Sequence, residues 1–389
     1  MLKFSKLFFQ SGKDTDAFAT RILPDTEQRN HLRSCVKKIE NHLKPRISNA
    51  TKTILGMERN VTPRFRTQGS WSYDTCVVPA KTPPQEMDWD YGVYLPVTVW
   101  EDNGPPHAMA KAYFALVEQF LTELCDAEKW KLLPGKDTCI RIQVADWAHI
   151  DVPLYAAPED EFKKITESVA LAKANTYDAT SMESVSFAED IETRQQWEDL
   201  DHVVMATRKG EWISSDPQVV ANWFKDRVEE HGPQLRRICR YLKAWRDHHW
   251  QQGGPTSVSI MIGVAQVFEP RAERDDRALE DVARRLSQTF LGEIHEPGID
   301  NGKEDFNRLQ GADREVAAQR FGELAAQLSR ARESALHEKV AVISQLRHQF
   351  GLRLPMDSAR VELDGDPETI RNIPASQVPV PLVPSTKAG

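Results

Sequence analysis

The chain has 389 residues, of which 40% are hydrophobic and 28% are charged, and its formal net charge is −8 at pH 7. This composition is typical of a folded globular protein, and the negative charge argues against binding nucleic acid over the whole surface. It leaves room for a local basic pocket, and no apolar run approaches the ~20 residues that a membrane helix needs.

The thiols and the N-terminus indicate a cytoplasmic protein. The five cysteines form neither a CxxC pair nor a metal-ligand pattern, which is typical of reduced thiols. The opening MLKFSKLFFQSGKD is too short for a secretory signal, and no small-residue cleavage site follows it. We therefore expect a cytoplasmic chain without a membrane segment.

The first expected element, after an irregular segment over 1–23, is a long helix. Asp25 or Thr26 can cap it, and its apolar residues keep a helical period past Pro45 to about Leu55. An amphipathic helix is expected later, over 107–129.

Strands are expected on both sides of this second helix. VTPRFRTQGS indicates a strand that ends in a turn, WSYDTCVV a short helix, and EMDWDYGVYLPV a strand of period two. TCIRIQVA and AHIDVPLYAA indicate two more strands that meet at a DW turn. Strands mixed with flanking helices indicate an α+β or α/β lobe with a mixed sheet.

The rest of the chain is expected to be helical and then extended. Helices are predicted near 276–291 and 312–350, after three earlier ones, and the proline-rich C-terminal segment cannot hold a helix. We predict a sheet lobe over 1–214, which includes the long N-terminal helix, a helical lobe over 215–355 and a flexible tail over 356–389.

Asp88 and Asp90 are candidate metal ligands. Alternate residues of a strand lie about 6.6–7 Å apart on one face, and carboxylates at this spacing can bracket two divalent ions ~3.5–4 Å apart. Mg²⁺ prefers such oxygen ligands. The alternative is a solvated strand face, with Trp89 pointing into the core on the other side.

The turn QGSWSYD is a candidate phosphate site. Gly69 allows close approach of the backbone to a ligand, Ser70 offers a hydroxyl and an amide, and a helix start would add free N–H groups. The alternative is an ordinary helix start that Ser70 caps.

Asp151 is the third candidate carboxylate. It shares a strand face with His149 while its neighbours are apolar, and a carboxylate in such surroundings is costly unless it is paired or bound to metal. The alternative is an ion pair with Arg141 on the preceding strand. We expect His149 to be a structural histidine.

The helix LRRICRYLKAWRDHHW carries Arg236, Arg240, Lys243 and Asp247 along one face. A solvated charged face is the usual outcome of such a pattern. A functional interpretation requires one basic residue, such as Lys243, to reach a triphosphate. Downstream, GGPTSVSIM begins a buried helix whose N-terminal hydroxyl groups suit an anion.

The order of the motifs QGS, QEMDWD, HIDVPLY and LKAWRD…GPTSVSIM resembles the polymerase-β-type nucleotidyltransferases. It is most similar to the bacterial cyclic-oligonucleotide synthases (CD-NTases) of anti-phage defence, in the branch of the bacterial cyclic GMP–AMP synthase. The similarity covers roughly residues 24–310. It implies an α+β fold in which a nucleotidyltransferase lobe with a mixed sheet packs on a helical lobe, with the active site in the cleft between them.

The resemblance implies synthesis of 3′,3′-cyclic GMP–AMP from ATP and GTP, with release of pyrophosphate. Asp88, Asp90 and Asp151 would be the catalytic residues and would hold two Mg²⁺ ions, with Mn²⁺ as an alternative. Lys243 and Ser257 would grip the donor triphosphate from the helical lobe. The nucleotide-binding residues that it implies are Gln68, Gly69, Ser70, Tyr73, Arg141, Lys243, Ser257 and Asp300.

Two expectations concern partners. In defence operons with E1/E2-like conjugating enzymes, the C-terminal residue of the synthase is joined to a target, and a flexible tail that ends in Gly389 would suit this; the alternative is a frayed terminus. No nucleic-acid activator is expected, because the chain has neither a basic DNA-binding surface nor a Cys/His zinc cluster.

Two other functions are compatible with the sequence. One is a nucleotidyltransferase that modifies RNA or protein, and the other is a nucleotide-binding regulator without catalysis. The presence of all three aspartates argues against the regulator.

Overall fold

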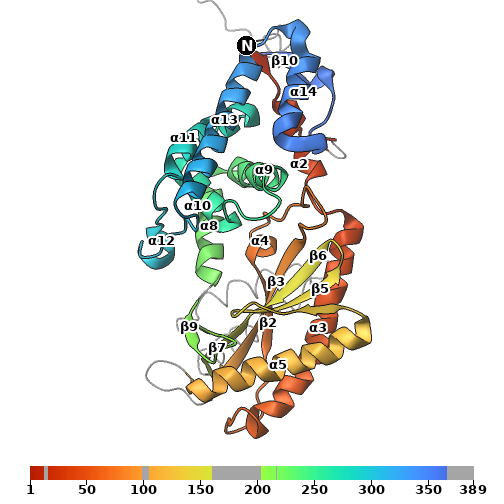
Figure 1. Ribbon diagram of the computed structural model, residues 1–389, viewed down its shortest axis with the longest axis vertical. Coiled ribbons are helices and arrows are strands. Elements are labelled where there is room, and N and C mark those ends of the chain that lie inside the picture. The colour runs from red at the N-terminus through yellow and green to blue at the C-terminus, as the bar shows by residue number, and fades with distance from the viewer. Residues whose placement is uncertain (13–15, 99–104, 160–202, 216, 366–389) are drawn as a thin grey trace, which may run out of the picture.

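The computed structural model describes residues 1–12, 16–98, 105–159, 203–215 and 217–365, and its two lobes are stacked along the long axis (Figure 1). One lobe is built on a sheet and the other on helices, each around its own hydrophobic core. The predicted α+β fold is therefore confirmed.

Among the described residues, eight strands form one mixed sheet in the order β4-β5-β6-β3-β7-β8-β9, with β2 paired to β3. Both β6 and β7 run parallel to β3, and Pro153 divides the expected strand AHIDVPLYAA between them. The bounds are β2 (Arg64–Gln68), β3 (Met87–Val97), β4 (Lys131–Leu133), β5 (Ile140–Ala145), β6 (Ala148–Val152), β7 (Leu154–Pro158), β8 (Val204–Ala206) and β9 (Trp212–Ser214).

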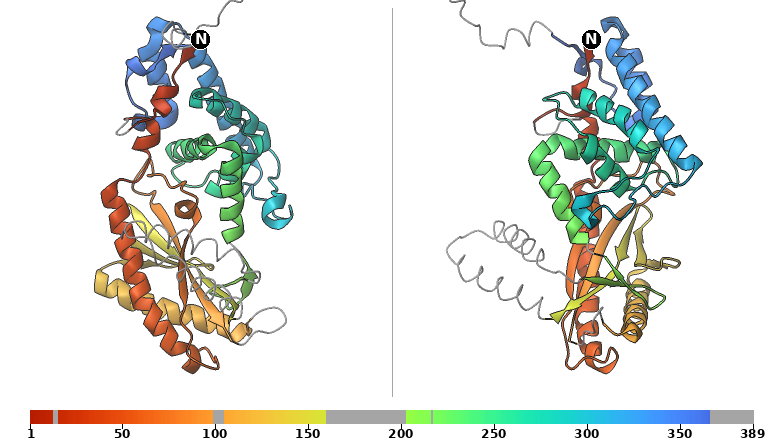
Figure 2. Two further views of the ribbon diagram at one scale, coloured as in Figure 1. Left: turned by 180° about the vertical axis from the view of Figure 1, so that it is seen from behind. Right: turned by 90° about the vertical axis from the view of Figure 1, so that its left-hand side faces the viewer.

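Two long helices, α3 (Thr26–Thr53) and α5 (His107–Glu128), pack against each other beside the sheet (Figure 2). Asp25 caps α3 in a capping box, because its carboxylate accepts from the Gln28 amide at 2.8 Å while the Gln28 side chain accepts from the Asp25 amide. The predicted helix over about 25–55 is confirmed, and its apolar stripe helps to form the core of the sheet lobe.

The helical lobe is built mainly on α9, whose apolar face is buried among the neighbouring helices. The helix predicted over 312–350 is two helices, because Ser334 has an extended backbone and ends the first of them. The bounds are α8 (Pro217–His231), α9 (Pro233–His249), α10 (Ser257–Val267), α11 (Asp275–Thr289), α12 (Pro297–Asp300), α13 (Ala312–Glu333) and α14 (Lys339–Phe350), and the short α4 (Gly69–Ser72) lies between the lobes.

The chain's first residues pack in the helical lobe, although the predicted boundaries put them with the sheet lobe. The rings of Phe8 and Phe18 pack against Tyr241 and Phe350 in the core of the helical lobe, with α1 (Ser5–Phe8) and α2 (Phe18–Arg21) providing them. These apolar side chains are too few and too irregularly spaced to show a period, which is why the sequence did not reveal this packing.

The start of the predicted tail is also ordered. β1 (Leu2–Lys3) pairs antiparallel with β10 (Glu362–Leu363), and Val361 is buried in the helical lobe's core. The predicted tail boundary at 356 is therefore too early. Gly389, the predicted conjugation site, lies outside the described residues.

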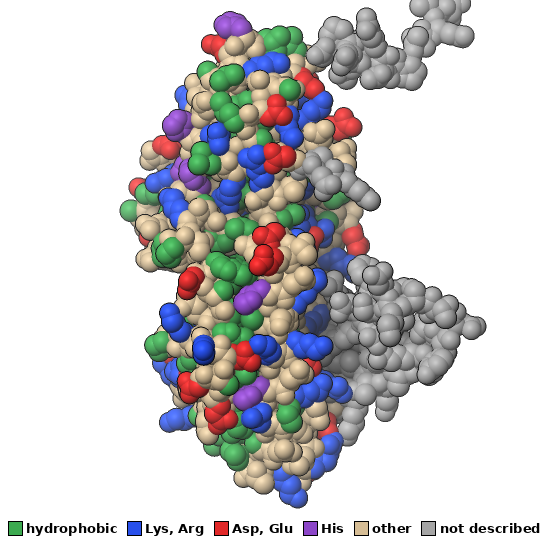
Figure 3. Space-filling model, turned by 90° about the vertical axis from the view of Figure 1, so that its right-hand side faces the viewer, with side chains coloured by type: hydrophobic (Ala, Val, Ile, Leu, Met, Phe, Trp, Pro, Cys, Tyr) green, Lys and Arg blue, Asp and Glu red, His purple; other side chains and the backbone are tan. Residues whose placement is uncertain are grey.

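Within the part of the chain that the structure describes, none of the helices combines the length and apolarity needed to cross a lipid bilayer. The five cysteines are buried free thiols. On the face shown in Figure 3, acidic and basic side chains are interspersed.

Candidate active site

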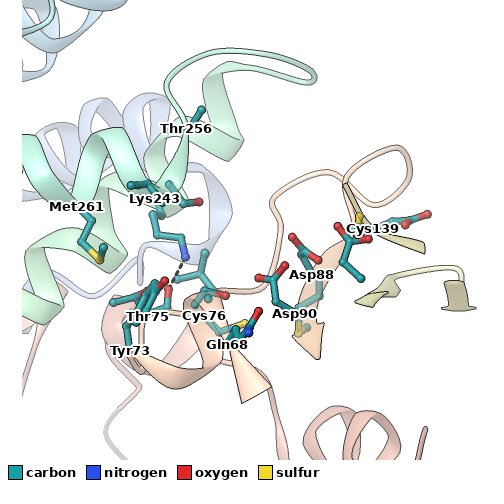
Figure 4. A pocket seen from close by; sticks show the side chains of 18 of the residues that line it. Gln68, Tyr73, Thr75, Cys76, Asp88, Asp90, Cys139, Lys243, Thr256 and Met261 are labelled. Atoms are coloured by element: carbon teal, nitrogen blue, oxygen red, sulfur yellow. Dashed lines mark hydrogen bonds between the residues drawn. The ribbon is translucent and has the colours of Figure 1, made fainter. Parts of the chain in front are cut away.

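A cleft of about 640 Å³ lies where residues of the sheet lobe and the helical lobe face each other (Figure 4). It brings together side chains from β2, α4, β3 and β6 on one side and from α9 and α10 on the other. The predicted site residues that line it are Gln68, Gly69, Ser70, Tyr73, Asp88, Asp90, Asp151, Lys243 and Ser257.

Strand register places three carboxylates on the cleft side of the sheet. Asp90 of β3 is the direct neighbour of Asp151 of β6, and Asp88 is the neighbour of His149. Trp89 is buried on the opposite face, where it stacks on Trp71 with ring centroids 4.2 Å apart. Trp71 also donates to the Asp88 carbonyl at 3.0 Å, so two tryptophans fix the backbone that carries the aspartates.

Asp151 is paired with two cations. The Arg141 guanidinium donates to both of its oxygens, at 2.6 and 2.7 Å, and Lys136 donates to Oδ2 at 2.7 Å. Burial raises the pKa of Asp151, but these two partners outweigh burial and hold the pKa at about 2. The ion pair with Arg141 that the sequence suggested is therefore present, and Arg141 itself is not among the residues that line the cleft.

Asp90 is in the opposite electrostatic situation. Burial, followed by the negative charges of Asp88 and Asp151, raises its pKa to about 8, although Lys136 and His149 act in the other direction. The site therefore holds one carboxylate stabilised as an anion beside another that is costly to ionise without a further cation. Such a contrast between neighbouring carboxylates is expected at a cation-binding site, because a bound cation would stabilise the ionised form of Asp90.

Glu86, His149 and Asp88 form a row that the sequence did not reveal. His149 Nδ1 lies 2.8 Å from Glu86 Oε2, and His149 Nε2 lies 3.0 Å from Asp88 Oδ1. Burial lowers the pKa of His149, but the neighbouring Asp88 carboxylate outweighs burial and raises it. One ligand atom from each of Asp88, His149 and Asp151 lies within 4.8 Å of the others, so this group fits a divalent cation.

Position 69 requires a glycine because its backbone lies against the side chain of Asp90. Its φ of +60° is in the left-handed region, and a Cβ at this position would lie 2.0 Å from Asp90 Oδ2. The turn is further held by Gln68, whose amide group contacts the hydroxyl groups of Tyr94 and Tyr155. The turn at Gly69 and the strand with Asp90 therefore pack directly against each other.

Gly69→Ala is expected to lower the free energy of unfolding by about 2–4 kcal/mol and the catalytic rate by roughly 100-fold. The left-handed backbone costs an alanine ~1–2 kcal/mol, and the displaced Asp90 carboxylate costs the remainder and the activity. Chemical denaturation and steady-state kinetics measure the two effects.

Gly56→Ala is the matched control. Gly56 has a similar φ of +71°, but a Cβ there would have no atom within 4 Å. We expect this control to lose only the ~1–2 kcal/mol of backbone strain and no activity. Equal losses in both variants would show that contact with Asp90 is not what requires Gly69.

The basic face of α9 holds the loop that follows α4. Arg236, Arg240 and Lys243 donate to the carbonyl groups of three successive residues, 73, 74 and 75, at 3.1, 2.9 and 2.7 Å. Lys243 is 4% exposed, and burial lowers its pKa. Its amine reaches across the cleft from the helical lobe, as Figure 4 shows. The basic face of α9 is therefore not simply solvated. In this structure its side chains are bonded to the loop that follows α4.

Two other predicted residues have different surroundings. Ser257 lines the cleft at the start of α10, where its hydroxyl lies 3.4 Å from Arg246. Asp300 lies at the end of α12 and accepts from the amides of Gly302 and Glu304, so its carboxylate caps its own loop. Asp300 is not among the residues that line the cleft, and the structure gives no support for its predicted role in nucleotide recognition.

The free energy of unfolding of the metal-free protein is expected to fall as the pH rises from 5 to 8. Asp90 has a raised pKa, so its contribution is complete below its unfolded pKa of ~4 and is lost as the pH passes about 8. His149 acts in the same direction, and the lowered pKa of Asp151 matters only in strong acid. The loss is at most about 4 kcal/mol for Asp90.

Thermal unfolding at pH 5 to 8, with and without Mg²⁺, measures this dependence. Mg²⁺ should offset the loss at pH 8, because a bound cation stabilises the ionised carboxylates. Stability that is unchanged or rises over this range in the metal-free protein would contradict the assigned electrostatics of Asp90.

Comparisons with known proteins agree with this geometry. Residues 63–155 match the family model of the cyclic GMP-AMP synthase DncV-like nucleotidyltransferase domain, and residues 232–362 match that of the cyclic GMP-AMP synthase C-terminal domain. Together the two models span more than half of the chain. They include the turn, all three aspartates, Lys243 and Ser257.

Two curated relatives are named cyclic GMP-AMP synthase. The one from Vibrio cholerae is 36% identical over 248 residues, which is 61% of this chain and 55% of the relative. The one from Escherichia coli is 37% identical over 242 residues, which is 61% of this chain and 54% of the relative. The aligned region thus spans about half of each relative's own length.

The structural similarity to solved proteins covers more of this chain than the sequence alignments with the curated relatives do. A variant of the Vibrio cholerae di-nucleotide cyclase DncV, in complex with ATP, GTP and 5MTHFGLU2, has a TM-score of 0.75 and 26% identity over 93% of this chain and 99% of that one. DncV with the linear intermediate 5′ pppA(3′,5′)pG has a TM-score of 0.73 over the same shares of both chains.

The sheet lobe and its acidic cleft define a nucleotidyltransferase. Within that class, the chain belongs to the family of DncV-like cyclic GMP–AMP synthases, the bacterial cGAS-like CD-NTases.

Proposed function

We propose that this protein joins ATP and GTP into 3′,3′-cyclic GMP–AMP, in two successive nucleotidyl transfers that each release pyrophosphate. The observation that carries the proposal is the convergence of Asp88, Asp90 and Asp151 on one side of a cleft that Lys243 and Ser257 line from the other. The proposal draws further support from relatives of this fold that were solved with ATP and GTP and with a linear dinucleotide intermediate.

The carboxylates are proposed to hold two Mg²⁺ ions, and the residues present fit this role. Their oxygen atoms are the ligands that Mg²⁺ prefers, and the raised pKa of Asp90, which burial and the neighbouring carboxylates cause, supports binding of a cation there. When bound, these ions would lower the pKa of the attacking 3′-hydroxyl group and neutralise charge on the triphosphate and on the leaving pyrophosphate.

The remaining chemistry is positioning by the chain's own residues. In each transfer a 3′-oxygen forms a bond to the α-phosphorus, the bond from that phosphorus to the bridging oxygen of pyrophosphate breaks, and the hydroxyl proton leaves to solvent. Gly69 and Ser70 are proposed to donate to phosphate oxygens from the turn beside Asp90. Lys243 is proposed to exchange its bond with the Thr75 carbonyl for one with the triphosphate, which also adjusts the loop that holds Tyr73.

Arg141 is proposed to act through Asp151. Its two hydrogen bonds fix the orientation of both carboxylate oxygens. Oδ2 also accepts from Lys136, so Oδ1 is the oxygen that keeps a further lone pair for a metal ion. The predicted direct contact of Arg141 with a phosphate or base is therefore replaced by a positioning role in this proposal.

Incubation with radiolabelled ATP and GTP in the presence of Mg²⁺ tests the proposed function. We expect label to appear in a small product that resists phosphatase, because a cyclic product has no terminal phosphate. Label on RNA or on protein would favour a nucleotidyltransferase that modifies a macromolecule, and no turnover at all would favour a regulator.

The proposed partners beyond nucleotides stay predictions. An E1/E2-like conjugating enzyme acting on Gly389 is tested by deleting Gly389, and unchanged labelling of the synthase by its cognate partner would overturn the idea. The expected independence from a nucleic-acid activator is tested by adding DNA or RNA to the synthesis assay, where we expect no stimulation.

A further inference from the structure

His149 is a buried polar residue beside the aspartates of the cleft. It is 6% exposed, and its Nε2 atom faces Asp88 Oδ1 at 3.0 Å without hydrogen-bond geometry. Neither of these two buried atoms has any hydrogen-bond partner among the described residues. Buried polar atoms are normally satisfied, and a cation bound by both atoms would supply the partner that each of them lacks when the imidazole ring is neutral.

The other side of the imidazole ring is firmly held. His149 Nδ1 lies 2.8 Å from Glu86 Oε2, and Glu86 is itself fixed by a hydrogen bond from Gln143. A carboxylate that accepts the proton of one ring nitrogen leaves the lone pair of the other nitrogen free. This carboxylate–histidine arrangement is typical of histidine metal ligands, in which the carboxylate sets the tautomer and the ring orientation.

The positions of the neighbouring ligands agree with this. His149 is the strand neighbour of Asp88 and lies two residues before Asp151, and the three side chains offer one ligand atom each within 4.8 Å. The set contains two carboxylate oxygens and one imidazole nitrogen. Imidazole suits Fe²⁺, Ni²⁺, Cu²⁺ and Zn²⁺ best, and Mn²⁺, which otherwise prefers oxygen ligands, accepts a nitrogen ligand more readily than Mg²⁺ does.

We propose that His149 is a direct metal ligand, oriented by Glu86, and that it makes one cation position of the cleft selective for a divalent transition ion such as Mn²⁺ over Mg²⁺. The proposal deepens the proposed function, since this ion would lie beside the reacting phosphates. It assigns a nitrogen ligand to a site for which the sequence suggested only aspartates. Asp151 takes part despite its cationic partners, because its Oδ1 atom accepts one hydrogen bond, from Arg141, and keeps a second lone pair for the ion.

Pulsed electron paramagnetic resonance tests the proposal directly. The full-length protein, stripped of metal and without nucleotide, receives one molar equivalent of Mn²⁺. We expect a nitrogen hyperfine coupling from a directly bound imidazole, and we expect His149→Gln to abolish it. A wild-type spectrum without nitrogen coupling, or a coupling that survives in His149→Gln, would overturn the proposal, and the first of these outcomes does not depend on how the variant folds.

Metal affinities supply the second readout. His149→Gln should weaken Mn²⁺ binding by at least ~10-fold, and Glu86→Gln should weaken it by about 10-fold while keeping the nitrogen coupling. Mg²⁺ affinity should change by less than about 3-fold in both variants, since oxygen ligands remain. Equal losses for both ions would mean that His149 only holds Asp88 in place.

His337→Gln is the matched control, because His337 is exposed on a short helix of the helical lobe, outside the cleft. It should leave the coupling and both affinities unchanged. The measurements involve no turnover, so their failure would leave the proposed synthase activity standing. An inactive protein with an intact nitrogen coupling would contradict the proposed function alone.

Discussion

Asp90→Asn is expected to abolish synthesis while making the metal-free protein more stable at pH 8. A carboxylate that holds a catalytic ion contributes several kcal/mol to the transition state, so its loss should lower the rate by roughly 10³-fold or more. In the metal-free protein the same carboxylate is repelled by Asp88 and Asp151 and is costly to bury. The amide removes this cost and nearly keeps the shape of the side chain.

The stability gain should depend on pH. At pH 5 the wild-type Asp90 is already protonated, so the variant gains little, whereas at pH 8 it should gain about 1–3 kcal/mol. Denaturant unfolding of both proteins at the two pH values, without metal, measures the difference. A variant that is less stable than wild type at pH 8 would show that Asp90 is not strained in the way the structure indicates.

Asp151→Asn is expected to abolish synthesis as well, but with the opposite effect on stability. Asp151 is the shared acceptor of Arg141 and Lys136, so the amide would leave two partly buried cations without a counter-charge. Breaking a buried ion pair costs about 3–5 kcal/mol, and because Lys136 is 43% exposed we expect a smaller loss of about 2–3 kcal/mol. The rate should again fall by roughly 10³-fold or more.

Asp137→Asn is the control for the removal of an ion pair in the same region. Asp137 pairs with Lys209 at 2.9 Å, but both side chains are about half exposed or more, so the pair should contribute less than ~1 kcal/mol. We expect normal activity and nearly unchanged stability. If Asp137→Asn and Asp151→Asn were equally destabilised, burial would not be the reason for the cost of the second.

The contrast between the two aspartates explains how a site of three carboxylates can fold. One of them is neutralised in advance by Arg141 and Lys136, so the chain does not have to assemble three unpaired negative charges. The remaining charge on Asp88 and Asp90 is left for the ligand to neutralise. Replacing Asp151 is therefore expected to lower both activity and stability, whereas replacing Asp90 is expected to lower activity and raise the stability of the metal-free protein.

Local patterns in the sequence were sufficient to predict the elements that carry the site. The period of two in EMDWDYG placed Trp89 in the core and the two aspartates in the cleft, and this is what the structure shows. Asp25 was one of two capping residues proposed for α3, and the strand with Asp151 was found in the same way. Such features depend only on neighbours in the chain, so a single sequence contains them.

Features that depend on distant contacts were not predicted from the sequence. Nothing local to Lys136 indicates that its amine reaches Asp151, and nothing near Glu86 indicates that it holds His149. His149 was expected to be structural because a lone histidine in a strand usually is. Its partner Asp88 comes from a neighbouring strand 61 residues away, and only the register of β3 and β6 brings the two together.

The surroundings of the basic face of α9 also could not be predicted from the sequence. Its helical spacing was visible in the sequence, but whether it faced solvent, a nucleotide or another part of the chain was not. The three carbonyl groups that it holds belong to the loop after α4, more than 160 residues earlier. The role predicted for Asp300 stays a prediction, because its carboxylate bonds to amides of its own loop and the sequence there carries no period that would fix the direction of the side chain.

Mass spectrometry of the product formed from an equimolar mixture of ATP, GTP, CTP and UTP with Mg²⁺ tests the central claim most directly. We predict a product with the mass and fragmentation of 3′,3′-cyclic GMP–AMP, two molecules of pyrophosphate for each product, and no product from Asp90→Asn. A macromolecule-bound nucleotide, or a dinucleotide yield that is unchanged in Asp90→Asn, would contradict the assignment of this cleft as a cyclic-dinucleotide synthase site.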